Sequence, residues 1–130
     1  MTTDRRPDSA APLGTMSDMT RVTTRVLDVA TTVPTTPLDP GTVLDGAPEA
    51  GSRALAAVSG VEVGVWEMTP GTATDVEVDE VFVVLSGSGT VSFDDDGEQV
   101  ALGPGSVVRL RAGERTTWVV HETIRKIYVA

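Results

Sequence analysis

Glu80 is the residue whose position best suits acid–base chemistry. It lies in a stretch that alternates like a β-strand, so it shares a strand face with Phe82. By the same rule, Thr116 and Trp118 share one face of a later strand. If both faces line one pocket, the aromatic rings keep water away from the carboxyl group, and desolvation favours the protonated form of such a group. Glu80 is therefore a candidate catalytic acid or base.

Two other roles for Glu80 remain open, and in both it forms an ion pair. One partner is Arg109 or Arg111 at the rim of the fold. The other is Lys126, the only lysine of the chain, which shares its strand face with Tyr128. A buried pair of Lys126 and Glu80 can bind a carboxylate or an amide, with the tyrosine as an added donor, or it can simply close the fold.

The chain has few groups that bind transition metals or act as nucleophiles. It contains no cysteine and one histidine, whereas zinc, iron, nickel and copper sites usually take nitrogen or sulfur ligands. His121 lies five residues after Thr116, so alternation places it on the opposite strand face, pointing outward and away from any Ser-His-Asp arrangement. Asp75 and Glu80 with water are weak candidates for manganese or magnesium, and no tightly bound cofactor is expected.

The two tryptophans, Trp66 and Trp118, are either core residues or a platform for a ligand, depending on whether a cavity lies beside them. The candidate ligand-binding side chains are Trp66, Asp75, Glu80, Phe82, Thr116, Trp118, Lys126 and Tyr128.

Short strands joined by turns must position these side chains. Thirteen glycines, eight prolines and frequent Val and Thr, without a long stretch of helical period, predict an all-β chain. The length of 130 residues suits one domain with a buried core. The expected strands are Ala54–Val58, Val61–Met68, Val81–Leu85, Thr90–Phe93, Glu98–Leu102, Ser106–Arg111, Thr116–His121 and Ile124–Val129. Strands of this number and length predict a small barrel or sandwich.

The chain divides into three parts by composition. Residues 1–20 are polar and lack periodicity, so we expect a disordered tail. Residues 21–52 are expected to hold a first strand, Arg21–Val29, and a Pro/Gly-rich segment wrapped on the body. Residues 53–130 then form the barrel, in which Asp94–Gly97 predicts a hairpin turn.

Two stretches, Gly71–Gly87 and Gly105–Val120, have the spacing of the two signatures of the cupin superfamily. In the first signature an acidic residue precedes a glycine with six residues between them, as Glu80 precedes Gly87 here. The match indicates a cupin resemblance in the spacing of the acid and the glycines.

The histidines of both signatures are missing. Aligned on Glu80, the first two histidine positions fall on Ala73 and Asp75, or on their neighbours in the shorter spacing, and Thr116 stands at the third position. Counted from the first glycine instead, the histidine positions fall on Glu77 and Asp79, but the acid position then falls on a valine. We prefer the alignment on the glutamate.

Three longer phrases resemble one branch of the superfamily. They are GVWEMTPGT at Gly64–Thr72, DEVFVVLSGSGTV at Asp79–Val91 and RAGERTTWVVHETIRKIYV at Arg111–Val129. They resemble the cupins named for (S)-ureidoglycine aminohydrolase, which are similar to the ethanolamine-utilisation Q proteins. The resemblance covers about residues 40–130 and implies a single conical β-barrel, the double-stranded β-helix or jelly roll, with a site inside and commonly a homodimer. It implies no single activity, because the fold hosts many.

The charge of the chain limits its partners. A net charge of −9 without a Lys/Arg cluster argues against nucleic acid and anionic membrane surfaces. No stretch reaches membrane-spanning length, so a cytoplasmic protein is expected, with a small molecule or a second copy of the chain as partner.

Three functions follow as alternatives. The first is binding of a small polar or carboxylate-bearing molecule in the barrel, without a tightly bound transition metal. The second is an enzyme of aminohydrolase, isomerase or lyase type that uses Glu80, with or without a weakly held divalent ion. The third is a non-catalytic dimerisation module whose barrel is packed shut.

Overall fold

The computed structural model describes residues 25–130, which form strands and turns and contain no helix. The all-β prediction is confirmed. Within this part of the chain, no helix has the length and apolar character needed to cross a membrane. The strands are β1 (Thr36–Pro37), β2 (Val43–Asp45), β3 (Glu49–Val58), β4 (Val61–Met68), β5 (Gly71–Val76), β6 (Glu80–Phe93), β7 (Gln99–Leu102), β8 (Val107–Leu110) and β9 (Arg115–Val129).

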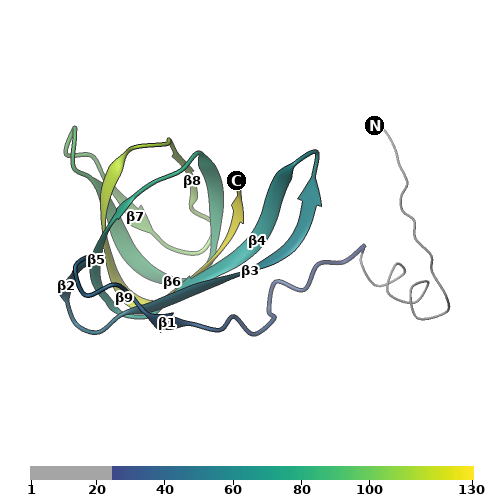
Figure 1. Ribbon diagram of the computed structural model, residues 1–130, viewed down its shortest axis with the longest axis horizontal. Coiled ribbons are helices and arrows are strands. Elements are labelled where there is room, and N and C mark those ends of the chain that lie inside the picture. The colour runs from purple at the N-terminus through teal and green to yellow at the C-terminus, as the bar shows by residue number, and fades with distance from the viewer. Residues whose placement is uncertain (1–24) are drawn as a thin grey trace.

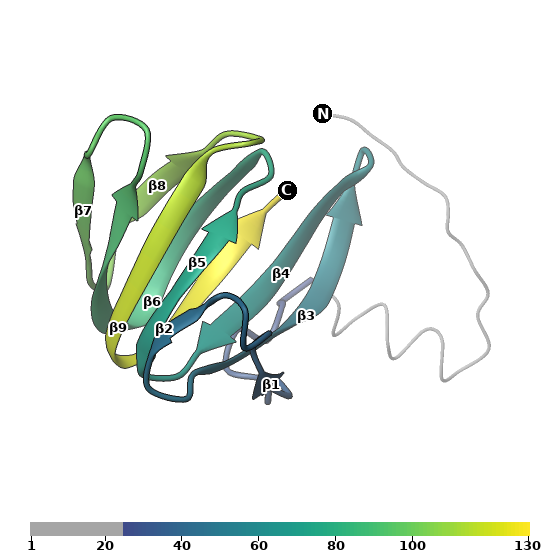
Figure 2. The same ribbon diagram turned by 60° about the vertical axis from the view of Figure 1, so that its left-hand side comes forward.

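Two long antiparallel strands, β6 and β9, form the middle of the sheet and pair along almost their whole lengths. The other edge of β6 pairs with β8 and then β7. The other edge of β9 pairs with β5 and then β4, which continues into β3 and β1. Figure 1 shows the resulting antiparallel sheet curled around a central space, and Figure 2 shows its long strands running side by side at a slant. This curled sheet is the framework that positions the site.

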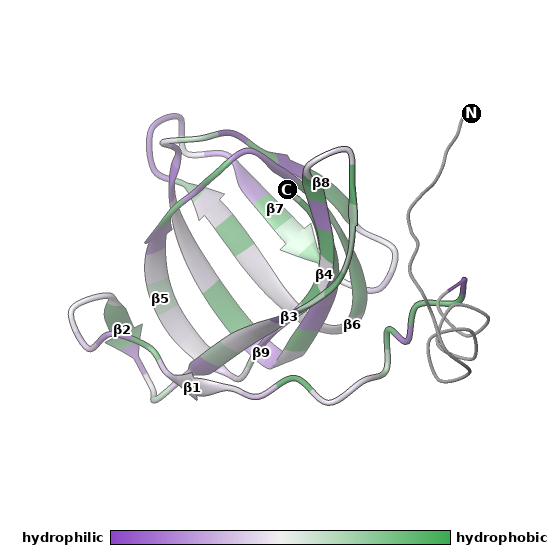
Figure 3. Cartoon of the chain, turned by 45° about the vertical axis from the view of Figure 1, so that its right-hand side comes forward, coloured by the Kyte–Doolittle hydropathy of each residue, from purple (hydrophilic) through white to green (hydrophobic). Residues whose placement is uncertain are grey.

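The concave face of the sheet holds the core. Alternate residues of each long strand point inward, so Phe82 and Val84 of β6 are buried, as are Ile124 and Tyr128 of β9. The same alternation appears in Figure 3, where hydrophobic bands repeat along the strands. Polar residues at inward positions are therefore exceptions that need partners within the curl.

Both long strands are longer than predicted. Val81–Leu85 and Thr90–Phe93 are two ends of β6, and Thr116–His121 and Ile124–Val129 are two ends of β9. The pairing between them shifts register at three places between Val84 and Gly89, so each strand bends there without ending. Gly87 and Gly89 therefore lie at irregularities within β6, although glycines in such a pattern often indicate a turn between two strands.

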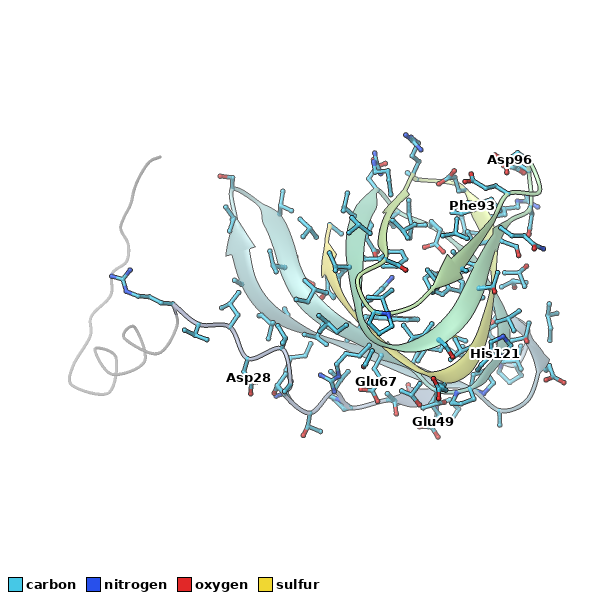
Figure 4. The ribbon with its side chains drawn as sticks, turned by 180° about the vertical axis from the view of Figure 1, so that it is seen from behind. Asp28, Glu49, Glu67, Phe93, Asp96 and His121 are labelled. Atoms are coloured by element: carbon cyan, nitrogen blue, oxygen red, sulfur yellow. The ribbon has the colours of Figure 1, made fainter. Side chains whose placement is uncertain are left out.

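The strand predicted at Arg21–Val29 is wrong for residues 25–29, which contain a turn and a bend. Residues 21–24 and the predicted tail at 1–20 lie outside the described residues. The guanidinium group of Arg125 holds the following segment by donating hydrogen bonds to the carbonyl oxygens of Val29 and Thr31, at 2.9 and 2.8 Å. It also pairs with Glu67 at 2.8 Å, which Figure 4 places on the outer side of the curled sheet. These groups fasten the N-terminal segment to the outside of the sheet.

The predicted wrapping loop also contains short strands. Thr36–Pro37 pairs with the start of β3, and Val43–Asp45 pairs with β5. A proline fits β1 because this strand lies at the edge of the sheet, where an amide donor is dispensable. The predicted turn at Asp94–Gly97 is confirmed, with a positive φ of 75° at its glycine.

Candidate functional site

A cavity of about 530 Å³ lies inside the curl. Six of the predicted ligand-binding residues line it, namely Trp66, Asp75, Glu80, Trp118, Lys126 and Tyr128. The other two, Phe82 and Thr116, are completely buried beside it. Strand alternation thus brings the predicted set together around one space.

The ammonium group of Lys126 forms an ion pair with Glu80, with 2.7 Å between Nζ and Oε2. Both side chains are largely buried, with exposed fractions of 6% for the lysine and 11% for the glutamate. The alternative pairing of Glu80 with Arg109 or Arg111 is wrong. Arg109 pairs instead with Asp79 on the exposed side, at 3.3 Å.

Three aromatic rings surround the same ammonium group. Its Nζ lies 4.1 Å from the ring centre of Phe82, 4.5 Å from that of Trp66 and 4.9 Å from that of Trp118. Lys126 lies directly opposite Trp66 in the pairing of β4 with β9, which explains its contact with that ring. Burial lowers the pKa of Lys126, and the neighbouring Glu80 carboxylate opposes this shift. The site therefore holds a cation by a carboxylate and by ring faces together.

Glu77 is a site residue that the preferred alignment missed. It is 7% exposed, and its Oε2 accepts hydrogen bonds from Thr116 Oγ1 at 2.5 Å and Trp118 Nε1 at 3.0 Å. Two signals pointed to it. The alignment counted from the first glycine put it at a histidine position, and it continues the inward alternation of Ala73 and Asp75.

Asp75 lines the cavity next to this buried carboxylate. Burial raises the pKa of Asp75, and repulsion from Glu77 raises it further. A backbone hydrogen bond from Val76 and the charge of Lys126 work in the other direction. The result is a carboxyl group that holds its proton to higher pH than an ordinary aspartic acid.

Tyr128 of β9 lines the cavity and donates a hydrogen bond to Glu62, which lies near the start of β4. Burial and this carboxylate raise the pKa of the phenol to about 12. The ordinary value for a tyrosine is about 10.

We expect one titration midpoint near pH 12 when absorbance at 295 nm is followed in the native protein, because Tyr128 is the only tyrosine of the chain. In denaturant the midpoint should fall to about 10. Between these values the unfolded chain releases the phenol proton and the native protein keeps it. This residue's contribution to stability is therefore complete below about pH 10 and is lost as the pH rises through 12. Glu62→Gln should lower the native midpoint, and an unchanged midpoint would show that the hydrogen bond has no influence.

The donor set does not suit a tightly bound transition metal. In the alignment on Glu80, Ala73, Asp75 and Thr116, or the neighbours of the first two, fall at the histidine positions of the cupin signatures, and Thr116 is already bonded to Glu77. His121 is exposed, as alternation predicted. Across residues 25–130 no three His, Cys, Asp or Glu side chains are grouped so that they could hold a metal ion.

An antiparallel sheet curled around a cavity of this kind is the architecture of the cupin class of proteins. The chain belongs to the family of EutQ-like cupin domains, whose family model matches residues 55–128, more than half of the chain. Among proteins with curated descriptions, none matches.

Several solved structures are similar. A protein of unknown function from Pseudomonas syringae pv. tomato is 23% identical with a TM-score of 0.68, over 79% of this chain and 46% of that one. The EutQ protein of Clostridium difficile is 23% identical with a TM-score of 0.57, over 75% of this chain and 79% of that one. A protein of unknown function from Rhizobium leguminosarum bv. viciae is 30% identical with a TM-score of 0.56, over 62% of this chain and 78% of that one. The chain spans about half the length of the Pseudomonas protein, and these likenesses establish a shared fold.

Proposed function

We propose that this cupin domain binds a small polar organic molecule in its barrel, without a tightly bound transition metal. The observation that carries the proposal is the cavity of about 530 Å³ with a buried Lys126–Glu80 pair in its wall. Small-molecule sites commonly have volumes of about 300–1,000 Å³ and a few polar groups among apolar ones. Trp66 and Trp118 supply the apolar part.

One of the three sequence-based alternatives, the dimerisation module, loses support, and so does the carboxylate-bearing ligand within the first. A dimerisation module with a barrel packed shut would leave no cavity of this size. A carboxylate-bearing ligand would have to share the ammonium group of Lys126 with Glu80, whose carboxylate already compensates its charge at 2.7 Å. The observations therefore favour a polar ligand that does not depend on the lysine for charge.

An enzyme remains the second candidate, because one observation favours it. Asp75 lines the cavity and its pKa is raised by burial and by Glu77, so its carboxyl group is suited to exchange protons with a bound molecule. In that case Asp75 is a better candidate acid or base than Glu80, whose carboxylate is engaged by Lys126.

The two tryptophans provide a direct test of binding. They are the only tryptophans of the chain, both line the cavity, and their rings lie 5.4 Å apart. We expect at least one compound from a panel of small amines, amides, alcohols and carboxylic acids to change the tryptophan emission saturably. Ala50→Phe, which fills the cavity wall, should abolish the response, whereas Ala57→Phe on the exposed part of the same strand should keep it. A response that survives Ala50→Phe would place binding outside the cavity and contradict the proposal.

Metal content is tested separately. Untagged protein should contain no stoichiometric metal by elemental analysis. Titration with manganese, zinc, nickel or iron(II) should give no saturable shift of the melting temperature. A stoichiometric metal, or a shift that Asp75→Asn removes, would overturn the metal-free proposal and support a metal-dependent enzyme.

A further inference from the structure

We infer that the ligand of the cavity is an organic cation whose positive group is held between Asp75 and Glu77. The inference deepens the proposed function and rests on it. It names the ligand class, which the family assignment leaves open.

The cavity wall is strongly acidic. Lys126 is the only cationic side chain among its lining residues in the described part of the chain. Its acidic lining residues are Asp39, Glu62, Asp75, Glu77 and Glu80. The lysine pairs with Glu80, so the remaining carboxylates of the cavity form no ion pair with a basic side chain of residues 25–130. An anionic ligand would be repelled by this wall and a cationic ligand attracted.

Glu77 is the observation that most strongly favours a cationic ligand. More than nine-tenths of it is buried, yet its hydrogen-bond donors, Thr116 and Trp118, are neutral and both bind Oε2. Within residues 25–130 no donor binds the other oxygen, Oε1, and no basic side chain forms an ion pair with the group. Buried carboxylates are normally paired with a positive group.

Asp75 lies beside it, and the two carboxyl groups repel each other. The charged groups that act on Asp75 are Glu77, Lys126 and Glu80, and the net effect of burial and charge is to raise its pKa. A cation bound between Asp75 and Glu77 would relieve the repulsion and lower this pKa. Binding should then be coupled to release of a proton.

The aromatic wall suits the same kind of ligand. Trp66, Phe82 and Trp118 already hold the ammonium group of Lys126 at 4.1–4.9 Å from their ring centres. Trp118 also donates its indole N–H to Glu77, so one residue links the aromatic wall to the acidic wall. A carboxylate beside an aromatic face is a combination that binds organic ammonium groups.

Three probes of almost equal shape test the charge preference: propylammonium, 1-propanol and propionate. Tryptophan emission is followed during titration of each. We expect saturable binding of propylammonium with a dissociation constant of about millimolar order, as suits so small a molecule. The neutral and anionic probes should bind at least about tenfold more weakly, since a charge-assisted contact contributes about 1.5–3 kcal/mol.

Variants then locate the positive group. Asp75→Asn and Glu77→Gln should each weaken propylammonium binding about ten- to hundredfold. Asp79→Asn is the matched control, because this exposed carboxylate lies close in sequence but pairs with Arg109 outside the cavity. It should leave binding unchanged. Circular dichroism shows whether each variant is folded, and Asp75→Asn, which changes a more exposed side chain, serves if the Glu77 variant does not fold.

Calorimetry in two buffers of different ionisation enthalpy should show proton release when propylammonium binds at mildly acidic pH, and Asp75→Asn should remove it. If propanol or propionate binds as tightly as propylammonium, or if the Asp75 and Glu77 variants bind normally, the inference is wrong although the binding function stands. The same holds if propylammonium fails to bind while another compound of the broader panel does. If no compound binds in the cavity, both proposals fail.

Discussion

Replacing Lys126 by methionine should lower the free energy of unfolding by about 3–5 kcal/mol at neutral pH. The substitution keeps an unbranched side chain between the aromatic rings, but it leaves the carboxylate of Glu80 buried without a counter-charge. Asp75 and Glu77 share the cavity wall and add negative charge. Removing one member of a buried pair is costly because the other member remains desolvated. Urea denaturation followed by circular dichroism measures the change.

The double variant Lys126→Met/Glu80→Gln separates this cause from a loss of packing. It removes both charges, so it should be more stable than Lys126→Met alone, with a coupling energy of about 2 kcal/mol between the two positions. The exposed pair of Arg109 and Asp79 is a control, with side-chain exposures of 44% and 71%. Breaking it by Arg109→Met should have a much smaller effect.

Glu80→Gln alone distinguishes two roles of the glutamate. The buried pair predicts a clear loss of stability, because the ammonium group of Lys126 then lacks its closest counter-charge. A variant that kept full stability but lost ligand binding would instead make Glu80 a residue of the binding site only. Equal stability of Lys126→Met and the wild type would contradict the buried-pair interpretation altogether.

The two-residue period of a β-strand explains why the sequence alone was sufficient to predict which side chains line the same cavity. Glu80, Trp118 and Lys126 lie on three stretches whose alternation is unbroken, and inward-facing residues of neighbouring strands in a curled sheet face one space. The sequence alone did not determine the ion-pair partner of Glu80. Lys126 was one of several basic residues that could reach it, and only the register of β9 against β4 and β6 selects it.

Local sequence gave weaker signals where small or polar residues form a strand. Gly71–Val76 was not predicted as a strand, because GTATDV contains few large apolar residues and begins with a glycine. Its pairing with the first half of β9 stabilises it. Missing this strand hid the alternation that continues to Glu77, so the most buried carboxylate of the site was overlooked.

The bend of the long strands depends on a glycine that lies between two stretches predicted as separate strands, Val81–Leu85 and Thr90–Phe93. Gly87 has a φ of 95°, a conformation that other residues rarely adopt. A Cβ atom there would also lie well inside contact distance of the carbonyl oxygen of Thr123 on β9. The close approach occurs where the pairing of β6 with β9 shifts register. Both backbone strain and steric overlap therefore oppose any side chain at this position.

Gly87→Ala should consequently destabilise the protein by about 3 kcal/mol or more, since strain and overpacking each cost about 1–3 kcal/mol. Three other glycines separate the two causes. Gly97 has a positive φ of 75° but open space around it, so alanine should cost only about 1–2 kcal/mol. Gly89 has no positive φ but would meet the carbonyl oxygen of Val119, and Gly103 has neither problem.

The expected order of destabilisation by alanine is therefore largest at Gly87, intermediate at Gly89 and Gly97, and within about 0.5 kcal/mol of zero at Gly103. Denaturant midpoints of the four variants measure it. If Gly87→Ala were no worse than Gly97→Ala, the strands would not approach as closely as described, and the bend would have another origin. Because β6 carries Glu80 before the bend, and β9 carries Trp118 and Lys126 on either side of it, the variant should also weaken ligand binding in the fraction that remains folded.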